Sequence, residues 1–210
     1  MAIKPILFNS EMVRAILDGR KDATRKIVKG FIPDDAVWGY TAFTPKGYIS
    51  CRGTFADGYG EKFFKLPCEP GDILYVRETW KKALNGYYYY EAWQRNDIAD
   101  VTKWKPSIRM PKEAARIWLK VTNVRVERLQ EITDEQAKRE GIQYDECPTG
   151  FTWKQETDMH NCYTTPIGAM QALWNSTIKK SDPDGYGWDA NPWVWTIEFE
   201  RCEKPEEISG

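Results

Sequence analysis

The chain has 210 residues, with 30 lysines and arginines against 31 aspartates and glutamates, so its formal net charge is −1. This balance argues against a protein that binds nucleic acid over its whole surface, although it leaves room for local basic patches. The length suits a single domain with insertions. We find neither a signal peptide nor an apolar stretch long enough to cross a bilayer, and therefore expect a cytoplasmic protein without a membrane partner.

The cysteines and the single histidine limit the chemistry that the chain can support. Five cysteines form an odd set without a CxxC pair, which favours reduced thiols. The only histidine, His160, lies in a polar segment. One histidine and scattered cysteines do not make a usual zinc site, so we expect no metal and no cofactor.

A short amphipathic helix is predicted over Ser10–Asp18, with Ser10 as its N-cap and Gly19 just past its end. A basic segment follows, in which Lys21 precedes Thr24 by three residues. A neutral, desolvated lysine can take the proton of a hydroxyl, so the two residues are a candidate nucleophile pair. Two residues at this spacing are a weak signal, and a solvated basic loop is the simpler interpretation.

Several runs of the sequence favour strands because they are rich in β-branched and aromatic residues between turn signals. They are 37–44, 48–55, 73–76, 87–93, 115–129 and 193–201. The first two are predicted to form a hairpin, and Asn85-Gly86 predicts a second one that returns over 87–93. Within 115–129 the apolar phase changes near Thr122-Asn123, which indicates a bulge or bend.

Charged and aromatic residues directly after the strand at 73–76 are candidates for a pocket mouth. Arg77, Glu78 and Trp80 hold these positions, and an ordinary ion pair at a strand end explains them equally well. The polar segment 94–111 contains Ser107 and Arg109 and is predicted to be a long loop.

A second helix is predicted over Thr133–Glu140, because Thr133 and Gln136 form a capping box and Gly141 ends it. Glu140 is its last side chain, where an acidic group is mildly unfavourable against the helix dipole. That placement is either accidental or a way to raise the pKa of the carboxyl. A third helix begins at Thr165, with Pro166 in its first turn.

Many short strands and few helices predict an α+β protein, built as a small mixed, partly open β-barrel flanked by short helices. We expect one domain over 1–202 with loop insertions at about 85–112 and 144–163, followed by a disordered tail over 203–210.

Several motifs occur together in order along the chain. They are GRKxxT at 19–24, PGDIL at 70–74, VRETW at 76–80, PSIRMP at 106–111, ITDEQAKREG at 132–141, WDANPW at 188–193 and WTIEF at 195–199. In this combination the chain resembles the ASCH domain, a PUA-like β-barrel, and in particular its longer phage and prophage type. The resemblance covers about Ile3 to Phe199 and leaves out the insertion at 144–163.

One branch of this family removes the acyl group from N4-acetylcytidine and related N4-acylated cytosines, without a metal. The resemblance implies that Lys21 and Thr24 of the GRKxxT motif are catalytic, together with Glu140 at the end of the helix. It leaves open whether Thr24 attacks the amide or positions a water. The chain departs from the small members in being about twice as long and in carrying Asp22-Ala23 inside the motif, so its substrate preference can differ.

The expected partner is a small nucleoside or free base. Substrate contacts are expected from Arg20, Arg77, Glu78, Trp80, Ser107 and Arg109, with Tyr75 or Trp104 as further aromatic candidates. Two other functions are compatible with the resemblance: a module that binds RNA or a modified nucleotide without chemistry, and a ribonuclease. In the binding module, basic residues of the segment 20–29 would line the groove.

Overall fold

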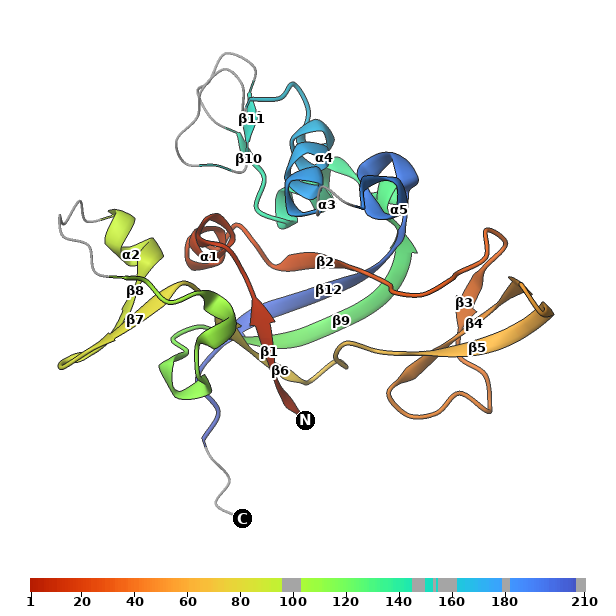
Figure 1. The fold of residues 1–210 in the computed structure, drawn as a ribbon, viewed down its shortest axis with the longest axis horizontal. Coiled ribbons are helices and arrows are strands. Elements are labelled where there is room, and N and C mark those ends of the chain that lie inside the picture. The colour runs from red at the N-terminus through yellow and green to blue at the C-terminus, as the bar shows by residue number, and fades with distance from the viewer. Residues whose placement is uncertain (96–102, 145–149, 153, 155–161, 179–181, 207–210) are drawn as a thin grey trace.

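The computed structural model describes residues 1–95, 103–144, 150–152, 154, 162–178 and 182–206. It is a mixed α+β structure made mostly of strands with a few short helices, as predicted (Figure 1). Its largest sheet has five strands in the order β1-β6-β9-β12-β2. Their bounds are Ile3–Leu7 for β1, Ile73–Arg77 for β6, Trp118–Arg128 for β9, Trp193–Cys202 for β12 and Ala23–Ile27 for β2.

The five-stranded sheet is open in the described part of the chain. β1 and β6 run parallel, and the other three pairs are antiparallel. β1 and β2 are its two edges, and no described ladder joins them. The strand pairing therefore does not confirm the small, partly open β-barrel that we expected.

The predicted irregularity in the long strand is confirmed. Glu198 of β12 pairs with Asn123, whereas Phe199 pairs with Val121, so Thr122 is the extra residue of a bulge. The bulge moves the apolar side chains of β9 from one phase to the other, which is why the sequence pattern slips at this point.

Three smaller sheets surround the central one, as Figure 1 shows. The first hairpin is confirmed, but β3 covers only Val37–Gly39 and β4 (Tyr48–Phe55) also pairs with an unpredicted strand, β5 (Gly58–Lys65). The second hairpin joins β7 (Trp80–Ala83) to β8 (Gly86–Tyr89). The return strand predicted to reach residue 93 is wrong beyond Tyr89, because the helix-favouring residues that follow form α2 (Tyr90–Arg95). β10 (Gln143–Tyr144) and β11 (Phe151–Thr152) form the third small sheet.

Three predicted helices are present. α1 covers Ser10–Leu17, but its N-cap is Asn9, whose extended backbone lets its side chain accept a hydrogen bond from the Met12 N–H. α3 (Asp134–Arg139) has the predicted capping box. α4 (Pro166–Thr177) begins at the predicted Thr165 cap, and a short α5 (Pro183–Tyr186) follows.

Three groups of buried apolar side chains hold these elements together. The largest lies between one face of the central sheet, α1 and β4, and includes Val13, Ile49 and Ile197. The second packs α3 and α4 against β12 through residues such as Met170 and Val194. The third lies beside the β7–β8 hairpin and contains Trp80. These clusters carry most of the burial that stabilises the fold.

The cysteines differ in part from the expected reduced thiols. Cys51, Cys68 and Cys202 are free, but Cys162 is disulfide-bonded, so the expectation is wrong for that residue. No helix in the described part of the chain is both long and apolar enough to cross a membrane. The single-domain boundary remains a prediction, and most of the 144–163 insertion and the end of the predicted disordered tail lie outside the described residues.

Candidate active site

Lys21 is brought into the interior by the end of α1. Gly19 has a φ of +75° and ends the helix, after which the N–H groups of Arg20 and Lys21 both donate to the Ala15 carbonyl, at 2.8 and 3.0 Å. This turn directs the Lys21 side chain inward, where the residue is only 3% exposed. The interpretation of this segment as a solvated basic loop is therefore wrong for Lys21.

The Lys21 ammonium group is surrounded by oxygen atoms. Its Nζ donates to Glu140 Oε2 at 2.8 Å, to the Glu140 carbonyl at 2.9 Å and to the Ala23 carbonyl at 2.8 Å. Three acceptors match the three N–H donors of a charged lysine. The geometry thus describes a buried ion pair, rather than the neutral amine that the nucleophile hypothesis requires at rest.

Glu140 lies at the C-cap of α3 and is 4% exposed. Its second carboxylate oxygen accepts a hydrogen bond from Arg25 Nη1 at 2.9 Å, so each oxygen of Glu140 faces a different cation. Gly141, with a φ of +101°, lets the chain turn away directly after it. A Cβ at Gly141 would lie 2.9 Å from the Ala15 side chain, so α1 and the end of α3 approach closely at this point.

The Lys21–Glu140 pair is one end of a longer ionic network. Arg25 Nη2 lies 2.6 Å from Glu127, which accepts from Arg125 Nε at 2.8 Å. Arg125 also pairs with Glu198, and Glu198 pairs with Arg139, whose Nε lies 2.8 Å from Asp22. The network contains four cations and four carboxylates: Lys21, Arg25, Arg125, Arg139, Asp22, Glu127, Glu140 and Glu198. Its charges therefore cancel, so the burial of its inner half leaves no charge without an opposite charge nearby.

Thr24 lies on β2 opposite Ile197 and is 5% exposed. Thr24 and Glu140 line one cavity of about 150 Å³, whose other walls include Phe8, Met12 and Trp174. We call it the Thr24 cavity. Lys21 lies beside it, with Nζ 5.6 Å from the centre of the Phe8 ring. No hydrogen bond joins Lys21 to Thr24 among the described residues.

One edge of β2 is free of strand partners in the described part of the chain, since β12 is its only ladder neighbour there. The Asp22 carbonyl accepts from Phe199 N–H, and Val28 N–H donates to the Trp193 carbonyl. In an antiparallel pair such bonds recur at every second residue, so Thr24 bonds to β12. The backbone N–H of Arg25 consequently points to the free edge.

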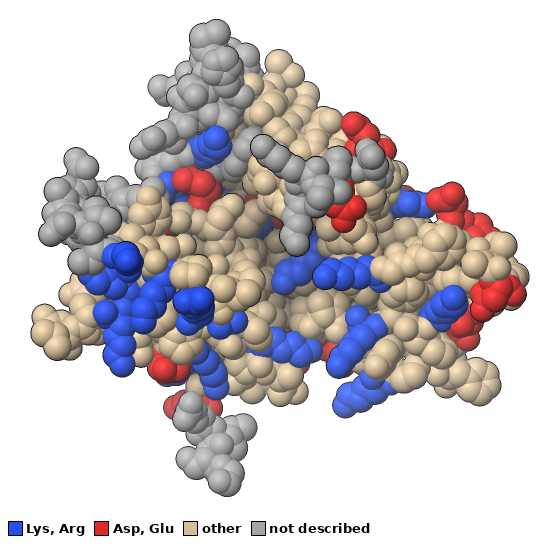
Figure 2. Space-filling model, in the orientation of Figure 1, with Lys and Arg blue, Asp and Glu red and all other residues tan. Residues whose placement is uncertain are grey.

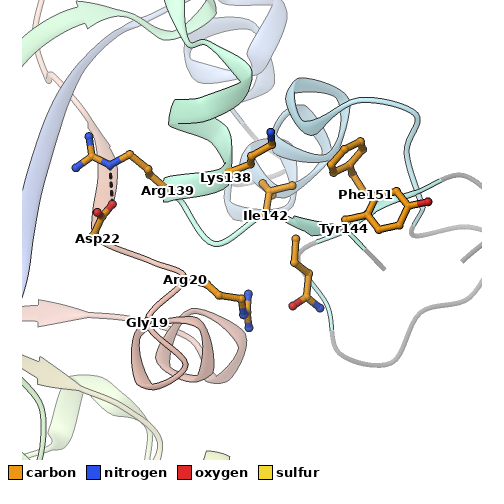
Figure 3. A pocket seen from close by; sticks show the side chains of 9 residues that line it. Gly19, Arg20, Asp22, Lys138, Arg139, Ile142, Tyr144 and Phe151 are labelled. Atoms are coloured by element: carbon orange, nitrogen blue, oxygen red, sulfur yellow. Dashed lines mark hydrogen bonds and ion pairs between the residues drawn. The ribbon is translucent and has the colours of Figure 1, made fainter. Parts of the chain in front are cut away.

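A second cavity, of about 570 Å³, lies where the segment after α1 meets the end of α3 and the β10–β11 hairpin (Figure 3). We call it the Tyr144 cavity. Arg20 and Asp22 line it from the first segment, Lys138 and Arg139 from α3, and Tyr144 and Phe151 from the hairpin. Arg20 also donates to the Gly141 carbonyl at 3.0 Å. This second cavity is thus lined by both neighbours of Lys21 in the sequence and by Arg139, which precedes Glu140.

A groove of about 310 Å³ begins at the other end of β2. Lys26, Lys29 and Lys65 line it together with Phe64 and Trp195, and Lys26 also lines the Thr24 cavity. We call it the lysine groove. Figure 2 shows Lys and Arg side chains gathered between the main body and the wing formed by β3, β4 and β5. Burial lowers the pKa of Lys26, and none of the described residues that line the groove is a carboxylate.

The other residues expected to bind substrate lie away from these three hollows. Arg77 Nε donates to the Met110 carbonyl at 2.7 Å. Glu78 is 1% exposed and accepts two hydrogen bonds from Arg116, at 2.9 and 2.8 Å. Burial is the main reason that the pKa of Glu78 is raised, against the opposing effect of Arg116. These contacts fit the simpler interpretation of an ion pair at a strand end.

The remaining candidates likewise do not line the Thr24 cavity. Trp80 is 5% exposed and packs against Tyr87, with ring centres 5.7 Å apart. Ser107 and Arg109 form a 3₁₀ turn, in which Arg109 is exposed. Of the residues expected to bind substrate, only Arg20 lines a described cavity next to the catalytic candidates.

Arg25 belongs to the basic segment 20–29, and its part in the ionic network was not predicted from the sequence. It is 7% exposed and bonds to both Glu140 and Glu127. The sequence did contain a signal for this placement, because residues four apart in an extended segment, such as Lys21 and Arg25, tend to lie on one side.

Comparison of the chain with protein-family models, with curated proteins and with solved structures found no match.

Proposed function

We propose that the protein is an amidohydrolase that cleaves the N4-acyl amide of N4-acetylcytidine or a related N4-acylated cytosine, giving the cytidine and a carboxylic acid. The observation that carries the proposal is the direct contact of Lys21 with Glu140, at 2.8 Å, beside a cavity that Glu140 shares with Thr24. The resemblance to ASCH domains names the same three residues. We further propose that the central sheet and the helices packed on it form a PUA-like fold.

The ion pair suggests how the reaction starts. Moving one proton from Lys21 Nζ to Glu140 Oε2 along their hydrogen bond yields a neutral amine and a protonated carboxyl group together. The amine can then take the Thr24 hydroxyl proton while the threonine oxygen attacks the amide carbonyl. Glu140 gives its proton to N4 as the C–N bond breaks, and the cytidine leaves. Water then hydrolyses the acyl ester on Thr24.

A second version of the mechanism has Thr24 position a water that attacks the amide directly. The two versions differ in whether an acyl group is ever carried by Thr24. Mass spectrometry of the protein quenched during turnover distinguishes them, because only the first version adds the mass of the acyl group to the peptide that contains Thr24.

The oxyanion formed on the carbonyl needs hydrogen-bond donors. The N–H groups of Arg20, Lys21 and Asp22 already bond to backbone carbonyls, which argues against them. The Arg25 N–H follows the nucleophile directly and points to the free edge of β2, so it is the donor that we assign. The cavity, at about 150 Å³, is smaller than the roughly 300–1,000 Å³ of pockets that enclose whole ligands. It suits the acyl group and the edge of the base.

The decisive test follows the absorbance of N4-acetylcytidine during incubation with the purified protein and with Lys21→Ala, Thr24→Ala and Glu140→Gln. Turnover by the parent and its loss in all three variants is the expected result. Glu135→Gln is the matched control, because Glu135 is an exposed residue of the same helix. A parent that turns over none of several N4-acylcytidines would refute the proposal.

The lysine groove favours a second candidate, a module that binds RNA or a modified nucleotide without chemistry. Lys26, Lys29 and Lys65 form no ion pair among the described residues, so their charges are available to phosphates. In this case oligonucleotide binding should weaken steeply with salt, and Lys29→Ala and Lys65→Ala should each reduce the salt dependence. Cleavage of the oligonucleotide in the same assay would indicate the ribonuclease alternative instead.

A further inference from the structure

The Tyr144 cavity has no part in the proposed reaction, yet it has the size and chemistry of a ligand site. Its volume of about 570 Å³ lies within the range of about 300–1,000 Å³ that is typical of small-molecule pockets. Thr24 and Glu140 do not line it. Two of its walls come from the hairpin of the insertion, which lies outside the family resemblance, so the cavity is a feature of this longer chain.

The charges in the cavity favour an anion. Asp22, the one carboxylate among the described residues that line it, is paired with Arg139 at 2.8 Å, as the dashed line in Figure 3 shows. Lys138 forms no ion pair among the described residues. Arg20 pairs with Asp18 at 3.2 Å and donates to the Gly141 carbonyl, which fixes its guanidinium group and leaves other N–H donors of the fork for a ligand. Figure 3 shows the Lys138 amine directed away from the Arg20 guanidinium group, so Arg20 is the side chain that suits a phosphate group, and Lys138 adds positive charge to the same cavity.

The hairpin supplies an aromatic surface on the other side. The Tyr144 and Phe151 rings pack edge to face, with centres 5.4 Å apart and planes at 80°. This contact holds Tyr144 in place although the residue is 71% exposed, so a face of its ring is open for stacking. Figure 3 shows that Arg20 comes from the segment after α1, whereas the two aromatic side chains come from the β10–β11 hairpin. A flat ring system joined to an anion would use both surfaces.

We propose that the Tyr144 cavity binds a nucleoside monophosphate, with the base stacked on Tyr144, the phosphate held by Arg20 and the charge of Lys138 attracting it to the cavity. A simple anion would leave the aromatic surface and most of the volume unused. An uncharged nucleoside would leave Lys138 without a counter-charge. The site is separate from the Thr24 cavity and does not depend on the amide chemistry proposed there.

The test is calorimetric titration of the full chain with each of the four common ribonucleoside 5′-monophosphates, with the corresponding nucleosides and with inorganic phosphate. At least one monophosphate should bind saturably and about tenfold more tightly than its nucleoside or phosphate alone. Tyr144→Ala should weaken that binding about tenfold and Lys138→Ala several-fold, whereas Tyr144→Phe should retain it. Tyr59→Ala and Lys46→Ala are the matched controls, because Tyr59 is equally exposed, at 74%, and Lys46 is an exposed lysine in a turn.

Three outcomes would overturn the proposal. They are no binding of any monophosphate at millimolar concentration, equal binding of nucleoside and monophosphate, and binding that survives both Tyr144→Ala and Lys138→Ala. Thr24→Ala separates this site from the proposed reaction, because Thr24 does not line the Tyr144 cavity and the variant should abolish amide hydrolysis while leaving nucleotide binding within twofold of the parent. Failure of one proposal is thereby distinguishable from failure of the other.

Discussion

The ion pair between Lys21 and Glu140 can be tested for its contribution to stability by a double-mutant cycle. The three proteins to compare with the parent are Lys21→Met, Glu140→Gln and the double variant. Methionine keeps the length and apolar stem of lysine without its charge, and glutamine keeps the shape of glutamate. The cycle isolates the interaction of the two side chains from the other contacts that each of them makes.

The structure sets the expected size of each effect. Lys21→Met leaves the carboxylate of Glu140, which is 4% exposed, with Arg25 as its remaining cation and leaves two backbone carbonyls without their donor. Removing one partner of a buried pair costs about 3–5 kcal/mol. Glu140→Gln should cost about 3 kcal/mol, since Lys21 keeps its two carbonyl acceptors. The double variant should be more stable than the sum of the single effects by about 1–3 kcal/mol.

Urea unfolding followed by far-ultraviolet circular dichroism measures these free energies, provided that the dependence on urea concentration is the same in all four proteins. The exposed pair Lys120–Glu200, 3.6 Å apart with side chains 52% and 58% exposed, is the matched control. Its cycle should give a coupling of about 0.5 kcal/mol or less. A Lys21–Glu140 coupling as small as that of the control would refute the assignment of a buried, mutually dependent pair.

Three further predictions concern other parts of the fold. Gly141→Ala should lower the free energy of unfolding, measured by urea denaturation, by about 1–3 kcal/mol, because the new Cβ would lie 2.9 Å from the Ala15 side chain of α1. Gly60→Ala is the control, because Gly60 has open space around it, and it should change the free energy of unfolding by less than about 1 kcal/mol. Burial raises the pKa of both Cys51 and Cys68 to about 11. Iodoacetamide at about pH 8 should therefore label these two thiols far more slowly in the folded than in the unfolded chain. Equal labelling rates in the two states would contradict their burial. Burial alone would raise the pKa of Glu127, but a threonine hydroxyl and two arginines outweigh it and lower that pKa. The folded state should therefore lose stability as the pH falls below the ordinary value of 4.5, and Glu127→Gln should flatten this dependence.

The features that were predicted correctly depend on neighbours in the sequence. The capping box of Thr133 and Gln136 defines the start of α3, and Gly141 defines its end, because both signals act within one helical turn. The bulge at Thr122 could be located for a similar reason, since a change in apolar phase is visible within a single strand. Glu140 was placed at its helix end by the same local evidence.

The ionic network could not be predicted, because its members are far apart in the sequence. Arg25 meets Glu140 across 115 positions and Glu127 across 102, and nothing in the residues themselves says which carboxylate each cation meets. The pairing depends on the register of β2, β9 and β12, which a single sequence does not reveal. For this reason the sequence suggested a neutral Lys21, whereas the fold provides a carboxylate and two carbonyls around it.

The segment 19–29 explains how one short basic run can serve several regions of the molecule. Successive residues of an extended chain point to opposite sides, so one segment can reach several parts of the molecule. Arg20 lines the Tyr144 cavity, Thr24 the Thr24 cavity and Lys29 the lysine groove, while Lys21 and Arg25 point into the network. The two inward cations are neutralised by carboxylates from distant strands and from α3. A formal net charge of −1 therefore does not argue against anion binding here, because lysines that form no ion pair among the described residues lie beside the lysine groove and the Tyr144 cavity.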